Sequence, residues 1–389
     1  MPNLASLFPG LNAKSLVDED FDQNLTQSEH FVYVCDLNAP WDVQLVTSKS
    51  HEISTIAWDP ENANTIVFSD ISGQIEVWQM KQSLISDWQC ISKAHFNGET
   101  FLKAFFISGM RKTFINMDHT DAGQYHDKFS FRSGSSTGQE FGQRDMLGIL
   151  LISHTGLAVC MSIPNHFHDQ GQVKTTQRSL DASRGRIRTV DIAFIKDGTL
   201  LVATSNGDPN APIRFYNMKP WFKDCAYDQG YELILDVESY PGLFTKAVGS
   251  GERSEEDKCL GIVDLSFVNG DDTDSFVVAT KHPAGGRLEL WELKEFQQNI
   301  HKMFLTSSID QSQATFSLPA WHYVEQFSGP VSQIVSIATP KYCFQTGRAA
   351  ACYVTVAYSD GSIQCLIRDN LQQIGNLGNL PIAIWVAKV

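Results

Sequence analysis

The sequence predicts an all-β protein, and within that class a β-propeller, from three observations. Short runs of alternating apolar and polar residues, rich in Ile, Val, Phe and Trp, recur along the 389-residue chain. Such alternation is typical of half-buried strands. The clearest group contains four such runs within about 45 residues, which is the length of one propeller blade, and groups of three runs recur further along the chain. No segment shows a sustained helical spacing of apolar residues.

The clearest group lies between His51 and His95. It reads HEISTIAWDP, NTIVFSDISG, QIEVWQM and SDWQCISKAH, which are four strand-like runs separated by turn formers such as Asp-Pro and Ser-Gly. One such sheet cannot bury both of its faces alone, so neighbouring blades must stack to complete the core. This unit therefore predicts a propeller of the WD40 type.

The same pattern returns at residues 187–218, 262–293 and 331–368. Large apolar side chains occupy matching strand positions, where we expect them to wedge between blades. Glycines precede the third strand, where a tight turn needs a positive φ. The predicted repeat core is Trp58, Gly73, Trp78, Phe194, Gly207, Tyr216, Phe267, Trp291 and Gly361.

Two less regular units, at 101–117 and 147–163, occupy about two repeat lengths between the first and second clear blades. Upstream, the runs at 31–37 and 41–46 resemble the last two strands of an earlier blade. We therefore expect seven blades, with the first and last irregular or incomplete. The predicted organisation is a polar, acidic amino-terminal segment (1–30), a propeller (31–370) and a divergent tail (371–389).

The charge balance limits the partners. Asp and Glu number 44 and Lys and Arg 30, which gives a net charge of −14. Such a chain is poorly suited to direct binding of nucleic acid or anionic membranes, because both depend on Lys and Arg. No signal peptide is evident, and the apolar stretch at 146–163 is interrupted by a turn, so we expect no membrane span. The eight cysteines are scattered, which favours reduced thiols of an intracellular protein.

Motifs with catalytic or metal-binding potential are weak. Ser136 stands at the centre of a G-x-S-x-G match, but a polar Gly/Ser-rich run surrounds it, and we interpret this run as a flexible linker. His166, His168 and Asp169 could ligate a metal, yet they follow a proline in an apparent loop. We therefore predict no catalytic residue, no metal site and no cofactor.

One local basic run stands out in the acidic chain. It contains Lys174, Arg178, Arg184, Arg186 and Arg188. Arg184, Arg186 and Arg188 are the candidate docking patch for an acidic partner such as an activation domain. The alternative is a solvated outer strand and loop without a partner.

Several segments together resemble one known family. The segments are 39–59 with 72–80, DKFSFRS at 127–133, RGRIRTVDIAF at 184–194 and VATSNGDPNAPIRFY at 202–216. They are similar to the amino-terminal propeller of the Mediator complex subunit 16 family, over roughly residues 20–370. The resemblance implies a nuclear, non-enzymatic subunit of the Mediator tail module. Its implied partners are other tail subunits and transcriptional activators, and indirectly RNA polymerase II.

The chain also departs from that family. We expect this chain to lack the helical carboxy-terminal region that the resemblance implies for the family, and residues 375–389 do not continue the family's pattern. Two other classes remain open on the generic blade pattern alone. One is a propeller scaffold of another assembly, such as a trafficking complex or a ubiquitin-ligase substrate adaptor. The other is a propeller hydrolase, for which no set of catalytic residues can be assembled.

Overall fold

In the computed structural model the described residues fold almost entirely into antiparallel β-strands, and they include one helix. Within these residues the strands form five four-stranded sheets and three two-stranded sheets. The prediction of an all-β, WD40-like propeller is confirmed. The structure describes residues 29–36, 39–59, 64–81, 86–107, 112–116, 129–133, 136–164, 173–180, 186–195, 198–225, 230–246, 258–269, 272–299, 315–339, 345–346, 349–350, 353–367 and 370–379.

Six sheets serve as blades, numbered along the chain. Blade 1 has two strands, β1 (His30–Asp36) and β2 (Ala39–Lys49). Blades 2 to 6 have four strands each, ordered from the innermost strand outwards. Blade 2 consists of β3 (Ile53–Trp58), β4 (Thr65–Asp70), β5 (Gln74–Met80) and β6 (Trp88–His95). Blade 3 consists of β7 (Phe101–Ile107), β10 (Met146–Ser153), β11 (Leu157–Pro164) and β12 (Lys174–Ser179), and blade 4 of β13 (Thr189–Phe194), β14 (Leu200–Ser205), β15 (Ile213–Asp224) and β16 (Tyr231–Leu243). Blade 5 consists of β17 (Gly261–Asn269), β18 (Asp272–His282), β19 (Gly285–Asn299) and β20 (Thr315–Ser328), and blade 6 of β21 (Ile334–Ala338), β24 (Tyr353–Tyr358), β25 (Ser362–Ile367) and β26 (Gln373–Asn379).

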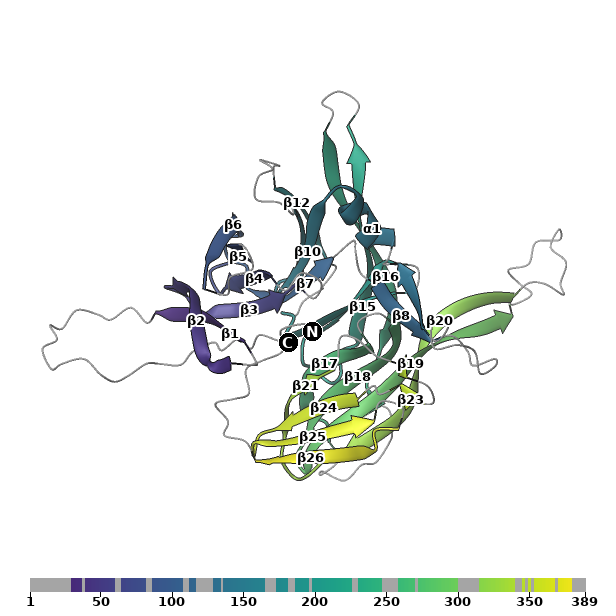
Figure 1. Cartoon of the computed structure of the whole chain (residues 1–389). Helices are drawn as coiled ribbons and strands as arrows, with labels where there is room; N and C mark the ends of the chain where they lie inside the picture. The colour runs from purple at the N-terminus through teal and green to yellow at the C-terminus, as the bar shows by residue number, and fades with distance from the viewer. Residues whose placement is uncertain are drawn as a thin grey trace, which may run out of the picture.

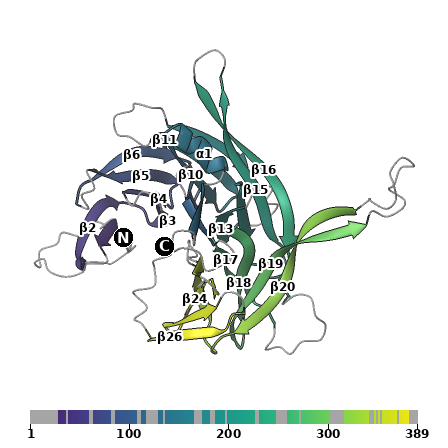
Figure 2. The same cartoon turned by 45° about the vertical axis from the view of Figure 1, so that its right-hand side comes forward.

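The blades follow one another around a common axis. Their first strands contact each other in the order β3, β7, β13, β17 and β21, so these strands are the innermost. Figures 1 and 2 show the resulting arc, which begins at β2 and ends at the sheet of β24 to β26. The described residues thus contain five complete blades and one of two strands. The incomplete first blade agrees with the sequence, but seven blades were expected.

The difference in number arises in blade 3. Its innermost strand β7 pairs with β10, and β10 with β11, so the two irregular units counted separately from the sequence form a single sheet. The long connection between β7 and β10 carries a separate hairpin, β8 (Lys112–Asn116) with β9 (Phe129–Ser133), and the helix α1 (Ser136–Gln143). Length alone suggested two repeats, because an insertion adds residues without adding a blade.

The helix α1 also corrects the interpretation of the Gly/Ser-rich run as a flexible linker. Ser136 begins the helix, and the ring of Phe141 is fully buried within it. Phe141 packs on Phe222 of β15 with ring centroids 4.8 Å apart. A Cβ atom at Gly148 of β10 would lie only 2.7 Å from the Phe141 ring. The absence of a side chain at Gly148 therefore allows the helix to pack against blades 3 and 4. This tertiary contact could not be predicted from the sequence, because the segment lacks the apolar periodicity of an amphipathic helix.

Blade 6 is complete but irregular. A two-stranded sheet, β22 (Gln345–Thr346) with β23 (Ala349–Ala350), lies between its first and second strands along the chain. Its outermost strand β26 pairs with β25 and begins beyond residue 370, where the sequence placed the end of the propeller. Residues 373–379 thus belong to the last blade.

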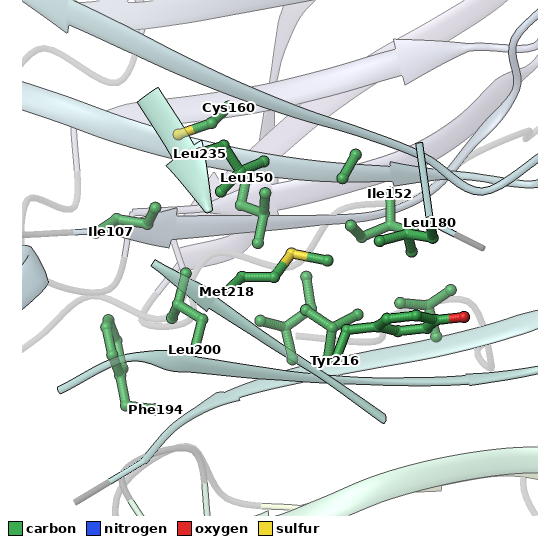
Figure 3. Packing of buried hydrophobic residues seen from close by; sticks show 14 of the residues in the cluster. Ile107, Leu150, Ile152, Cys160, Leu180, Phe194, Leu200, Tyr216, Met218 and Leu235 are labelled. Atoms are coloured by element: carbon green, nitrogen blue, oxygen red, sulfur yellow. The ribbon is translucent and has the colours of Figure 1, made fainter. Parts of the chain in front are cut away.

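Apolar clusters between neighbouring blades form the core. Figure 3 shows the cluster between blades 3 and 4, where Leu150 and Cys160 of one sheet face Leu200 and Met218 of the other. Further clusters lie between blades 1 and 2, 2 and 3, 4 and 5, and 5 and 6. Each interface buries one face of each sheet, which explains why isolated blades would not be stable.

Glycine is required at the turn before β5. Gly73 has a φ of +87°, and a Cβ added there would lie 2.1 Å from the backbone oxygen of Phe96. Gly207 and Gly361 precede the third strands of blades 4 and 6 with φ values of +84° and +86°. In blade 5 the positive φ falls on Gly285.

Candidate functional site

The structure places the aromatic repeat-core residues between blades. Phe194 of β13 packs edge-to-face on Phe105 of β7, with ring centroids 5.4 Å apart. The ring centroid of Phe267 in β17 lies 6.3 Å from that of Phe215 in β15. Tyr216 is buried in the cluster between blades 3 and 4. The ring contacts make Phe194 and Phe267 part of the scaffold, whereas Tyr216 belongs both to this core and to the lining of a groove.

Trp78 and Trp291 show a pairing that sequence reasoning missed. The indole Nε1 of Trp78 donates to Glu76 at 2.9 Å, and that of Trp291 donates to Glu289 at 3.1 Å. Each glutamate precedes its tryptophan by two residues, so both side chains lie on the same strand face. The Glu-x-Trp motif, which occurs in both QIEVWQM and LELWEL, is the sequence signal from which this pairing could have been predicted. Trp58 is half-buried in the apolar cluster that includes Trp78.

Glu76 joins blades 1 and 2. Its carboxylate is fully buried and contacts Lys49 of β2 at 2.5 Å and Lys93 of β6 at 3.0 Å. Desolvation raises the pKa of Glu76, but the hydrogen bonds from Lys49, Lys93 and Trp78 outweigh it, so the pKa lies below its usual value. The carboxylate is therefore ionised at neutral pH and ties the two-stranded first blade to its neighbour.

A second polar network runs along the axis through the innermost strands. Asp191 of β13 contacts the Lys103 ammonium of β7 at 2.9 Å and accepts a hydrogen bond from the backbone N–H of Phe267 in β17 at 2.8 Å. Asp264 of β17 accepts in the same way from Ile337 N–H of β21 at 2.9 Å. Burial lowers the pKa of Lys103, but the Asp191 carboxylate outweighs it, so the pKa is raised. Each aspartate thus fastens its blade to the next.

The predicted docking patch lies partly within the described residues. Arg186 and Arg188 are exposed, whereas Arg184 lies outside the described residues. The backbone N–H of Ile187, between the two arginines, donates to His154 O at 2.8 Å, and that of Arg188 donates to Ser205 O at 2.8 Å. The backbone of the patch is therefore held against turns of blades 3 and 4 while both side chains face solvent.

The other two basic residues of the run lie on β12 and reach the next blade. The Lys174 ammonium donates to the carbonyl of Tyr231 and lies 4.2 Å from the centroid of its ring. Arg178 Nε donates to the carbonyl of Leu235 at 3.1 Å. Both contacts cross from the outer strand of blade 3 to the outer strand of blade 4, so these cations bridge two blades.

A groove of about 310 Å³ opens beside this bridge. One wall comes from β12 and the other from β16, and the Tyr216 side chain of β15 contributes to the lining. The lining residues are Arg178, Ser179, Tyr216, Leu235, Asp236, Val237 and Ser239. Sequence reasoning did not find this site, because it depends on the packing of two sheets.

Exposed apolar side chains gather at both ends of the arc. On β2, Trp41 is 81% exposed, and Val43 and Leu45, which share a strand face, are 46% and 50% exposed. On the last blade, Val335, Tyr353 and Ile374 are 53%, 43% and 61% exposed. In the interior of the arc the corresponding faces are covered by the next blade, whereas no further blade among the described residues covers these two surfaces.

The described residues offer no cluster of three or more His, Cys, Asp or Glu side chains that could hold a metal ion. The histidine candidates His166 and His168, with Asp169, lie outside the described residues. Within the part of the chain that the structure describes, no helix is long and apolar enough to cross a membrane.

Successive four-stranded meanders around a polar axis define a WD40-like β-propeller. Residues 89–381, more than half of the chain, match the sequence profile of the family described as Mediator complex subunit 16, N-terminal. The chain therefore belongs to the Mediator complex subunit 16 family, and the resemblance found in its sequence is confirmed.

Relatives named Mediator of RNA polymerase II transcription subunit 16 span nearly the whole chain. The protein of Aedes aegypti is 30% identical over 352 residues, covering 88% of this chain and 41% of the relative. The Homo sapiens protein is 24% identical over 363 residues, covering 90% of this chain and 40% of the relative. The chain thus spans about two fifths of the length of these relatives.

Solved structures with a related arrangement are more distant. Saccharomyces cerevisiae Sqt1 aligns with a TM-score of 0.43 and 11% identity, covering 90% of this chain and 68% of that one. Chaetomium thermophilum Raptor aligns with a TM-score of 0.41 and 13% identity, covering 84% of this chain and 21% of that one.

Proposed function

We propose that the chain acts as a non-catalytic subunit of Mediator, in the tail module of the complex in the nucleus. There it binds other tail subunits and gene-specific activators, and so links these activators to transcription by RNA polymerase II. The observation that carries this proposal is the family match over residues 89–381. A propeller supports the role physically, since cross-blade ion pairs make it a rigid body with a large rim for several partners. A scaffold of another assembly is not favoured, because the generic blade pattern alone does not account for the family match.

The exposed Arg186 and Arg188 side chains are the proposed contact for an acidic activator. In a chain of net charge −14, a local positive surface attracts acidic segments that the rest of the molecule would repel. Contacts of this kind act mainly through association rate and weaken with salt.

Affinity purification of the tagged chain from nuclear extract tests the subunit role. Recovery of other Mediator subunits, identified by mass spectrometry, is the expected result. The double variant Arg186→Glu/Arg188→Glu serves as the matched control, and it should keep the Mediator subunits while losing acidic activators. Recovery of no Mediator subunit, either with this chain or with a chain extended to the full length of the relatives, would overturn the proposal.

A further inference from the structure

The groove between β12 and β16 contains a buried polar atom that the fold does not use. Tyr216 is only 3% exposed, and its hydroxyl has no hydrogen-bond partner among the described residues. A buried hydroxyl without a partner costs about 1 to 3 kcal/mol, so such groups are rare in folded proteins. Figure 3 shows this hydroxyl at the edge of the apolar cluster, directed away from Met218 and Leu200. The same side chain lines the groove, so a ligand seated there could accept this hydrogen bond.

Arg178 supplies a positive charge at the same groove. Its Nε donates to the carbonyl oxygen of Leu235, and both residues line the groove. This is the hydrogen bond that Arg178 makes within the described part of the chain, so the two terminal nitrogens keep their donors for another acceptor. A guanidinium with both terminal nitrogens available suits a planar carboxylate, which accepts two parallel hydrogen bonds.

The surroundings favour a singly charged acid over a phosphate group. Asp236 also lines the groove, but its carboxylate accepts a hydrogen bond from the Trp221 indole at 2.7 Å. Asp236 alternates along β16 with Leu235 and Val237, so its side chain leaves the opposite face of the strand. Arg178 is the one cation among the lining residues, and one guanidinium balances one carboxylate, whereas a phosphate carries nearly twice that charge.

The groove also lies near the docking patch. The end of β12 is held to the turn at 154–156 by the hydrogen bond from Leu180 N–H to Gly156 O at 2.8 Å. The residue that follows Arg186 is held to the same turn through His154 O. Arg178 and Arg186 therefore flank one turn, and an extended acidic segment over the patch can place a side chain in the groove.

We propose that the groove between blades 3 and 4 is a binding site for an aspartate or glutamate side chain of an acidic peptide, held by Arg178 and the Tyr216 hydroxyl. This inference rests on the proposed function and names the contact through which an acidic activator is recognised. Arg186 and Arg188 attract the acidic peptide electrostatically, while the groove binds one of its carboxylate side chains directly.

Fluorescence anisotropy with the purified full chain tests the site. The probe is a labelled synthetic peptide in which Asp and Glu alternate with Leu and Phe, and the comparison peptide carries Asn and Gln instead. Tyr216→Phe should weaken binding of the acidic peptide roughly tenfold, and Arg178→Met roughly 10- to 100-fold. Asp236→Asn should change binding little, because this side chain leaves the opposite face of β16 and pairs with Trp221. Tyr33→Phe, which alters a half-buried tyrosine of blade 1, is the matched control and should have no effect.

Thermal unfolding shows whether the variants fold. Tyr216→Phe removes no hydrogen bond within the described residues, so its melting temperature should equal that of the wild type. Equal binding of the acidic and amide peptides would overturn the inference. Binding that is lost in Arg186→Glu/Arg188→Glu but unchanged in Tyr216→Phe and Arg178→Met would also overturn it, while leaving the docking patch in place. Weaker peptide binding in both groove variants, together with failed recovery of Mediator subunits, would instead support the groove and refute the subunit role.

Discussion

Replacing Glu76 with glutamine should release the first blade from the second. The side chain keeps its size and can still accept from the Trp78 indole, but it loses its negative charge. Lys49 would then retain a cation that is only 12% exposed, with no carboxylate beside it. Breaking a buried ion pair from one side costs more than the pair contributed, because the remaining charge stays desolvated.

The two lysines contribute unequally to the expected loss. Lys93 is 58% exposed, so its contact with Glu76 is worth at most about 1 kcal/mol. The buried Lys49 contact accounts for most of the effect, and we expect a total loss of about 3 kcal/mol in the free energy of unfolding. Lys49→Met added to Glu76→Gln should restore part of this loss, since no unpaired cation remains.

Urea denaturation followed by tryptophan fluorescence measures the loss, with Glu232→Gln on the exposed surface of β16 as the matched control. Hydrogen exchange should rise in β1 and β2 before it rises elsewhere, because Glu76 anchors that sheet. The pKa of Glu76 is lowered in the fold, so its contribution is present above the ordinary glutamate value of about 4.3. It is lost as the pH falls through the folded value, and the difference between wild type and variant should therefore narrow in acid.

Two results would refute this reasoning. One is an unfolding free energy for Glu76→Gln that matches the Glu232→Gln control. The other is a double variant with Lys49→Met that is less stable than Glu76→Gln alone. Either result would mean that the ion pair does not hold blade 1 in place.

Three further substitutions probe the scaffold. Trp291→Ala should lower the free energy of unfolding by about 3 to 5 kcal/mol, because it leaves a cavity. Trp41→Ser, at an 81% exposed site, should leave the denaturation midpoint unchanged, and equal effects of the two substitutions would contradict the burial of Trp291. Gly73→Ala should prevent stable folding, because the added Cβ would lie 2.1 Å from a backbone oxygen. Gly98→Ala, at a φ of +79° with open space around it, should lower the free energy of unfolding by only about 1 to 2 kcal/mol, and calorimetry distinguishes the two variants. Asp264→Ala should lower the melting temperature and increase hydrogen exchange in the last blade, and unchanged exchange there would argue against the axial contact.

Much of the fold could be predicted from the sequence, because strand formation leaves a local trace. Alternation of apolar residues with period two marks each strand, and the Gly73 turn marks the start of a third strand. Seven blades were expected, and the described residues contain six. The sequence spacing treated the residues between β7 and β10 as a repeat, whereas the structure shows a hairpin and α1 inserted into one blade. Spacing measures chain length and cannot separate an insertion from a blade.

The candidate sites divide in the same way. The basic run was visible by composition, and two of its arginines are exposed as a docking patch requires. Composition could not show that Arg178 instead reaches across to Leu235, 57 residues away along the chain. It also could not show that the Tyr216 hydroxyl has no partner among the described residues, since burial and hydrogen bonding depend on both sheets.

The sequence by itself thus determined the all-β architecture, the repeating blades and the family, because these follow from local periodicity and from segments that can be compared one by one. The tertiary structure decided which charges meet across blades, such as Lys103 with Asp191, and where a groove opens between two outer strands. The physical reason is that such contacts join residues far apart in the chain. Their energies depend on distance and burial, which exist only after the sheets have packed.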